Sequence, residues 1–178
     1  MARPCSPPRR SVTSPRGIPL AASASTNTHA MLFLSERPDV QEKLRADHRL
    51  IPAFIEELLR YEPSVHGLVR VTTAEVTLSG TTIPAGSLVL ALLASANRDE
   101  NRYSNPEAFV LERQQASVSF GHGIHSCIGS QLVRVEARLA LEALLTRLKR
   151  FTRVPGESTW TMLPIRRAPV KLPFRFEA

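Results

Sequence analysis

The sequence predicts a mainly α fold with a smaller β portion. Its longest helical pattern covers residues 131–149, where apolar residues recur at helical spacing. Two shorter helical patterns precede it, and a few short stretches have the alternation or the apolar run typical of strands. A chain of 178 residues can bury one sizeable core.

Composition excludes several classes of protein. No apolar run approaches the roughly 20 residues of a membrane span. The net charge is +7, but four arginines lie within residues 1–20 and no acidic residue precedes Glu36. Nucleic-acid binding would therefore rest on that segment alone, and no interleaved aromatic and basic residues support it. Two cysteines are too few for a disulfide framework, so the sequence fits a reducing compartment such as the cytoplasm.

Residues 1–20 are rich in proline, arginine and serine, a composition that neither holds a helix nor offers much to bury. We expect residues 1–25 to be a disordered tail foreign to the domain, and residues 26–178 to form the domain itself.

Two helices are expected next. Pro38 suits a first helical turn before a short helix over residues 39–45. A second helix should span residues 51–61, because Pro52 lies in its first turn and Pro63 follows its end. On the second helix Glu57 and Arg60 are three residues apart and share a face, which alone indicates only a weak surface ion pair.

Strands are expected after these helices and at the C-terminal end. Val76 and Leu78 alternate with polar residues before the Ser79–Gly80 turn. Residues 88–93 are a continuous apolar run, which predicts a fully buried strand. Residues 170–176 alternate again.

The helix over residues 131–149 is expected to turn Leu132, Val135 and Leu139 inward. Its polar face carries Arg134, Arg138 and Glu142 at i, i+4 spacing. That face is either solvated or a docking surface for an acidic electron-transfer partner.

The segment from Ser119 to Gly129 reads S-F-G-H-G-I-H-S-C-I-G and predicts a tight loop that presents one thiol. Gly121 and Gly123 allow the backbone to fold back with its N–H groups inward. Cys127 lies just before the long helix, where the helix dipole favours thiolate over thiol. A thiolate among backbone donors, with Phe120 excluding water, suits a soft or redox-active metal.

Other interpretations of this loop remain. A lone cysteine beside a glycine turn is usually a small buried apolar residue. His122, His125 and Cys127 could supply three zinc ligands, but a structural zinc site needs a fourth. A Cys–His nucleophile has no further support. Haem binding is the interpretation that the residues favour.

The loop resembles the haem-binding signature F-G-x-G-x-H-x-C-x-G of the cytochrome P450 family, the haem-thiolate monooxygenases, in their soluble bacterial form. All six fixed positions match, at Phe120, Gly121, Gly123, His125, Cys127 and Gly129. From about Thr26 onward the chain is similar to the last part of such a domain. The expected fold is therefore the C-terminal part of a cytochrome P450 fold, without the N-terminal half.

The resemblance implies several roles. Cys127 would be the axial ligand to the iron of haem b, iron protoporphyrin IX. Arg70 and His125 would bind the haem propionates. Glu57, Arg60 and Arg113 would form a buried ion-pair network.

Residues 26–34 resemble the back half of the family's distal helix. Counting back from Pro38 places the oxygen-activating threonine near Ala22 and its acidic or glycine neighbours near residues 18–21. None of these positions matches, so no distal catalytic residue is identified.

The function implied by the resemblance is oxidation of a small hydrophobic organic substrate with O₂, that is, a monooxygenase and oxidoreductase. A separate ferredoxin or flavoprotein would supply the electrons. The alternative is a non-catalytic haem-binding remnant of such an enzyme.

Overall fold

The computed structural model describes residues 10–13, 18–161, 163 and 165–177, with side chains described from Ala24 onward. Within these residues the helices are α1 (Ile18–Glu36), α2 (Pro38–Ala46), α3 (Ile51–Tyr61), α4 (Leu93–Ala96) and α5 (Ser130–Arg147), with the 3₁₀ turns η1 (His48–Leu50) and η2 (Gly123–His125). The strands are β1 (Arg10–Thr13), β2 (Leu68–Val71), β3 (Val76–Leu78), β4 (Thr81–Ile83), β5 (Leu88–Ala91), β6 (Arg150–Arg153), β7 (Thr159–Trp160) and β8 (Pro169–Glu177). The predicted mainly α fold with a smaller β portion is confirmed.

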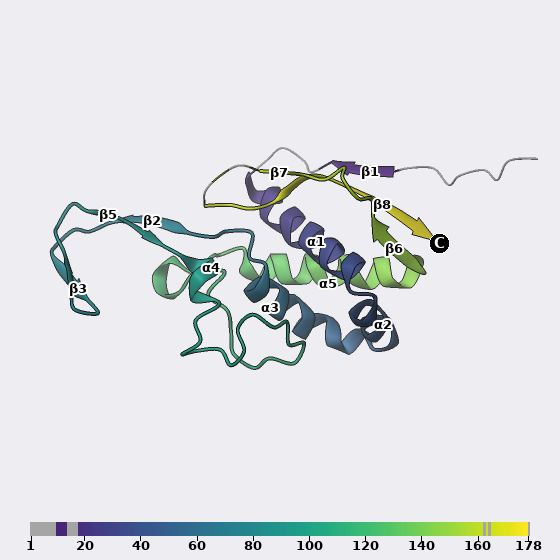
Figure 1. Ribbon diagram of the computed structural model, residues 1–178, viewed down its shortest axis with the longest axis horizontal. Coiled ribbons are helices and arrows are strands. Elements are labelled where there is room, and N and C mark those ends of the chain that lie inside the picture. Colours follow the sequence, from purple (N-terminus) through teal and green to yellow (C-terminus); the bar gives the residue numbers. More distant parts are fainter. Residues whose placement is uncertain (1–9, 14–17, 162, 164, 178) are drawn as a thin grey trace, which may run out of the picture.

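The core lies where α1, α3 and α5 pack together and an antiparallel sheet covers α1 (Figure 1). In that sheet β8 lies between β1 and β6, and β7 also pairs with β8. An aromatic cluster supports the packing, because the Phe33 ring on α1 lies 4.2 Å from that of Phe109 and 5.8 Å from that of Phe54 on α3. Apolar side chains of these helices therefore exclude water from the centre.

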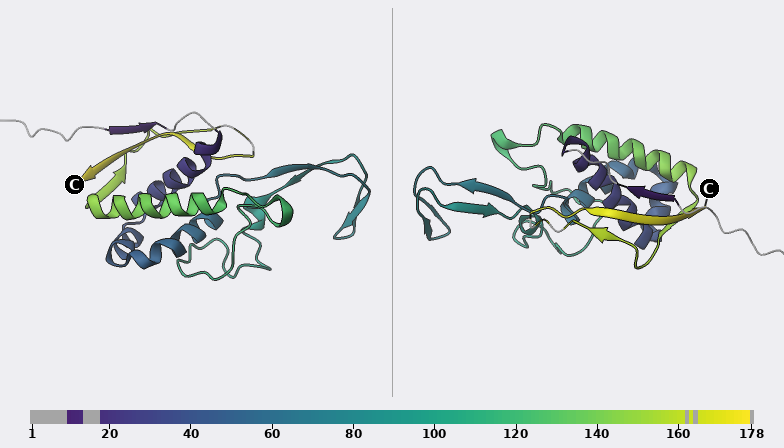
Figure 2. Two further views of the ribbon diagram at one scale, coloured as in Figure 1. Left: turned by 180° about the vertical axis from the view of Figure 1, so that it is seen from behind. Right: turned by 90° about the horizontal axis from the view of Figure 1, so that it is seen from above.

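A long two-stranded arm extends away from the helices (Figures 1 and 2). Its inner part pairs β2 with β5 and its tip pairs β3 with β4, both antiparallel. The prediction of a fully buried strand over residues 88–93 is wrong: Leu88 is 75% exposed and Leu90 48%. An apolar run favours burial, but among the described elements β2 and β5 pack mainly against each other.

Helix α5 faces the core with a different stripe from the predicted one. Val133, Ala137 and Leu141 are buried, whereas Leu132, Val135 and Leu139 are exposed. The prediction was wrong because both stripes are apolar at helical spacing, and only the packing against α1 and α3 selects one of them.

Residues 1–25 were expected to be disordered, but residues 10–13 and 18–25 have regular secondary structure. The first range is strand β1, which pairs with Leu172 and its neighbours on β8, and the second is the start of α1. Pro19 fits there because a first helical turn needs no N–H donor from proline, and the following alanines favour helix. Residues 1–9 and 14–17 lie outside the described residues, and the domain boundary near residue 25 stays a prediction. None of the described helices is long and apolar enough to cross a membrane.

Candidate functional site

The loop that carries Cys127 is a closed turn at the start of α5. The amide of Cys127 donates to the carbonyl of Phe120 at 2.8 Å, and the amide of Ser126 donates to that of Gly123 at 3.0 Å. Gly121 and Gly123 have φ angles of +74° and +68°, which L side chains rarely adopt. At Gly121 a Cβ atom would also lie 3.4 Å from the His125 carbonyl oxygen. The two glycines are therefore required by the turn itself.

The turn presents Cys127 at the surface, three residues before the first residue of α5. Gly129 lies beside the thiol: a Cβ there would make an ordinary van der Waals contact with Cys127 Sγ at 3.8 Å. The flanking Ile124 and Ile128 are fully exposed. The expected backbone donors to the sulfur are not in place: among the described residues no N–H group bonds to Sγ, and the Cys127 amide itself is used to close the turn. The thiol is thus open to a ligand, with two exposed apolar residues close to it in the sequence.

Of the other predicted haem-binding residues, Arg70, Gly123 and His125 are exposed. His125 lies in η2, two residues before Cys127, and Phe120 is half-buried under the guanidinium of Arg134, 4.9 Å from the ring centroid. Arg70 lies on β2 in the arm and donates to the Val69 carbonyl, without an ion pair to any described residue. The three potential zinc ligands do not gather: in the described part of the chain, no three His, Cys, Asp or Glu side chains form a group that could hold a metal ion.

Glu57, Arg60 and Arg113 form one buried network. The Arg60 guanidinium binds the Glu57 carboxylate through two hydrogen bonds of 2.8 Å, and Arg113 Nε lies 3.2 Å from both carboxylate oxygens. The Val110 amide donates to the same carboxylate at 2.8 Å. Each side chain is at most 3% exposed. The sequence placed these three residues together only through the family resemblance, because E-x-x-R spacing alone indicates a surface pair.

The two guanidiniums also hold the irregular segment between α4 and the cysteine loop. Arg60 donates to the carbonyls of Asn97, Pro106 and Ala108 at 2.8–2.9 Å. Arg113 donates to the Ser104 carbonyl at 2.8 Å. Carbonyl groups of this irregular segment are thereby hydrogen-bonded to the two guanidiniums, which the Glu57 carboxylate holds in place.

Asn97 connects this network to the cysteine loop, and sequence analysis assigned it no role. Its side chain accepts from the Val118 amide at 2.8 Å and donates to Ser119 Oγ at 2.7 Å. Ser119 in turn donates to the Leu59 carbonyl on α3 at 2.6 Å. Asn97 is completely buried. A polar residue in an otherwise unpatterned segment gave no sequence signal for this contact.

Replacing Asn97 with leucine should loosen the cysteine loop. The change leaves the Val118 amide without its buried acceptor, at a cost of about 1–3 kcal/mol. We expect faster hydrogen exchange at Val118 and Ser119, with the amides of α5 unchanged. Asn101→Leu is the matched control, because Asn101 is exposed and its side chain donates to nearby Asp99. Equal exchange in both variants would remove Asn97 from the support of the loop.

Arg134 was expected on a free polar face, but it links α5 to α3. It forms an ion pair with Glu56 and donates to its second carboxylate oxygen at 3.1 Å. This contact raises the pKa of Arg134, chiefly through its hydrogen bond with Glu56. Arg138 lies 3.9 Å from Glu142 and is half exposed. Of the two arginines, Arg138 is therefore the more available to a partner.

The region of Ala22, where the resemblance places the distal threonine, is helical as part of α1. Its side chain lies outside the described residues.

Comparison with known proteins gives a consistent result. The family model described as "Cytochrome P450" matches residues 21–165. The chain is 42% identical over 152 residues to cytochrome P450 monooxygenase PikC of Streptomyces venezuelae, covering 83% of this chain and 36% of that one. It is 44% identical over 121 residues to the cyclomarin C epoxidase CymV of Salinispora arenicola, covering 67% and 31%. The chain thus spans about a third of the length of these relatives.

Among solved structures, cytochrome P450 CYP109Q5 from Chondromyces apiculatus matches with a TM-score of 0.84 and 39% identity. The match covers 89% of this chain and 42% of that one. The predicted C-terminal part of such a fold is therefore confirmed.

Proposed function

The chain belongs to the cytochrome P450 family, whose members bind haem, and we propose that it carries the haem-binding part of a haem-thiolate monooxygenase. The single observation that supports this most is the exposed Cys127 on a turn closed by two positive-φ glycines. The relatives named as monooxygenase and epoxidase support the reaction class.

The residues present fit haem. A thiolate is a suitable axial ligand for haem iron, and Cys127 is the exposed thiol. The exposed Ile124 and Ile128 beside it match the apolar faces of a porphyrin. Arg70 has unused guanidinium donors for a propionate, and a guanidinium pairs well with a carboxylate. His125 is proposed as a second propionate partner.

The bound haem would supply the oxygen chemistry, and the protein would position it. Cys127 would fix the iron on the side of α5. Phe120, packed under Arg134, would keep water from the thiolate. Through Asn97 and Ser119, the buried network of Glu57, Arg60 and Arg113 would hold the loop at a fixed distance from α3.

We further propose a small hydrophobic organic substrate and a ferredoxin or flavoprotein electron donor. The exposed Arg138 on α5 would be one contact for an acidic donor surface. The cytoplasm is the proposed location, since a thiolate ligand requires a reduced cysteine. The second hypothesis, a non-catalytic haem-binding remnant, rests on the mismatch of residues 18–22 with the expected distal residues, whereas the named relatives favour the enzyme.

Titrating the chain with haem tests the proposed site. Arg70→Gln should weaken haem binding by a factor of about 10 or more, because a charge-assisted hydrogen bond contributes about 1.5–3 kcal/mol. Arg175→Gln is the control, because Arg175 is an exposed arginine on β8. A spectroscopic titration gives both affinities. Equal affinity in Arg70→Gln and the control would exclude Arg70 from the haem site.

A further inference from the structure

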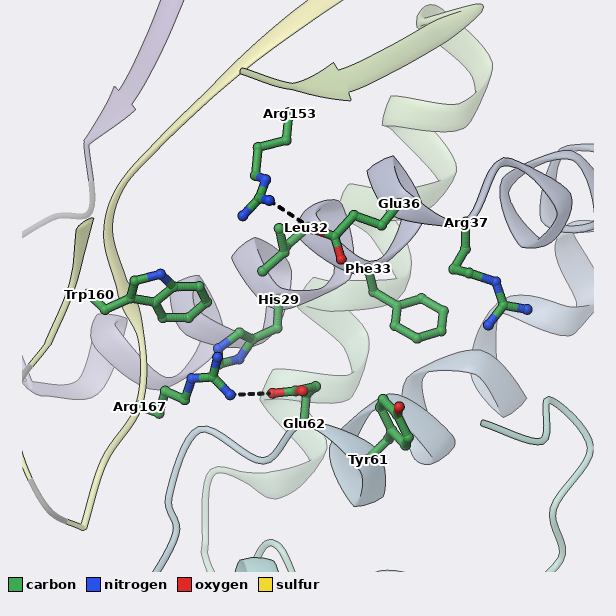
Figure 3. Close-up of a pocket in the computed structure, with 10 residues that line it drawn as sticks. All are labelled: His29, Leu32, Phe33, Glu36, Arg37, Tyr61, Glu62, Arg153, Trp160 and Arg167. Atoms are coloured by element: carbon green, nitrogen blue, oxygen red, sulfur yellow. Dashed lines mark hydrogen bonds and ion pairs between the residues drawn. The ribbon is translucent and has the colours of Figure 1, made fainter. Parts of the chain in front are cut away.

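A cavity of about 470 Å³ lies between the end of α1, the end of α3 and the strands β6 and β7 (Figure 3). Its lining includes none of the residues of the cysteine loop. Its volume is in the range of small-molecule sites. It is therefore a second place where a ligand could bind, separate from the proposed haem site.

We propose that this cavity binds a small planar aromatic carboxylate. The proposal does not depend on haem binding.

Aromatic rings supply the surfaces for a planar ligand. Trp160 lies at one end of the cavity with its indole stacked near the imidazole of His29, at a centroid distance of 6.1 Å and an interplanar angle of 21°. Phe33 and Tyr61 lie toward the other end (Figure 3). Aromatic side chains favour offset or edge contacts with another ring, so a ligand ring has partners at both ends.

Guanidinium groups supply the charge. Arg167 lies over the Trp160 ring at 4.6 Å and touches Glu62 through one contact of 3.4 Å. Arg153 touches Glu36 through one contact of 3.3 Å. Each guanidinium has five N–H donors in a planar fork, so both keep donors for a further carboxylate. Arg37 also lines the cavity, but both of its side-chain hydrogen bonds go to Asp39, so Arg167 and Arg153 are the groups that would receive an anion.

His29 gives independent evidence for a ligand. It lines the cavity, is 2% exposed, and its Nε2 atom has no hydrogen-bond partner among the described residues. Its Nδ1 atom lies 3.4 Å from Ser64 Oγ. Burial, with smaller contributions from Arg167 and His66, lowers the pKa of His29 to about 4, so the ring is neutral at pH 7. An unpaired buried polar atom costs free energy, and a polar group on the ligand would offset that cost.

The ligand series benzoate, benzamide and benzamidine tests the proposal, because the three share a ring and differ in charge. Trp160 is the only tryptophan of the chain. Its indole N–H resonance in ¹⁵N-labelled full-length protein therefore reports binding in this cavity. We expect a saturable shift with benzoate and a dissociation constant of about 1 mM, as suits nine non-hydrogen atoms. Benzamide and benzamidine should bind at least about tenfold more weakly.

Arg167→Gln should weaken benzoate binding about tenfold, whereas Arg147→Gln, an exposed arginine at the end of α5, should bind like the wild type. If circular dichroism shows that Arg167→Gln is unfolded, Arg153→Gln takes its place. The ligand series on the wild-type chain is decisive in either case. Equal affinity for benzoate and benzamide, tighter binding of benzamidine, or a benzoate shift that never saturates would each overturn the proposal.

Discussion

Replacing Glu57 with alanine is expected to destabilise the protein by about 3–5 kcal/mol. The reason is the arrangement around the carboxylate, which accepts hydrogen bonds from Arg60, Arg113 and the Val110 amide in a buried site. Removing it leaves two buried guanidiniums facing each other without an anion. The free energy of unfolding of a domain is usually only about 5–15 kcal/mol, so the expected loss is a large part of the protein's stability.

Chemical denaturation followed by circular dichroism measures the effect. Glu57→Gln separates the effect of charge from that of shape, because it keeps the side-chain volume but removes the negative charge. It should be nearly as destabilising as Glu57→Ala. Glu142→Ala is the control: this residue lies on the outer side of α5, 3.9 Å from Arg138, and its loss should cost less than about 0.5 kcal/mol. Similar losses for Glu57→Ala and Glu142→Ala would mean that the buried network does not stabilise the chain.

The second large effect is expected at Cys127. Cys127→Ala should weaken haem binding by a factor of at least about 100, equivalent to about 2.7 kcal/mol, because it removes the only exposed thiol of the described residues. The fold itself should change little, since the side chain is exposed and packs against nothing in the core. Haem titration followed by absorption, with circular dichroism as a check on folding, separates these two effects.

Cys5→Ala is the matched control for Cys127→Ala, because it removes the other cysteine of the chain. It should bind haem with unchanged affinity. If Cys127→Ala and Cys5→Ala bound haem equally well, neither thiol would be the ligand.

Much of the fold could be predicted from local chemistry. Helix α3 begins and ends at the predicted residues, because Pro52 and Pro63 mark both ends. The cysteine turn could be predicted because Gly121 and Gly123 allow the positive φ angles that the structure has. These features depend on short stretches of sequence, so no knowledge of distant contacts was needed.

The features that could not be predicted depend on contacts between distant segments. The inward stripe of α5 was misassigned because two apolar stripes compete and tertiary packing decides between them. Residues 88–93 were expected to be a fully buried strand because the run is continuously apolar, but β5 is largely exposed. Asn97 was missed because its partners Val118 and Ser119 are more than 20 residues away.

The central claim is that Cys127 holds haem through its sulfur. The most direct measurement is the absorption spectrum of the reduced, haem-loaded chain under carbon monoxide, in the wild type and in Cys127→His. The wild type should show the red-shifted band for which the family is named, and Cys127→His should lose it even where haem is retained. A wild-type chain that takes up stoichiometric zinc and no haem, or a band that survives in Cys127→His, would contradict the claim.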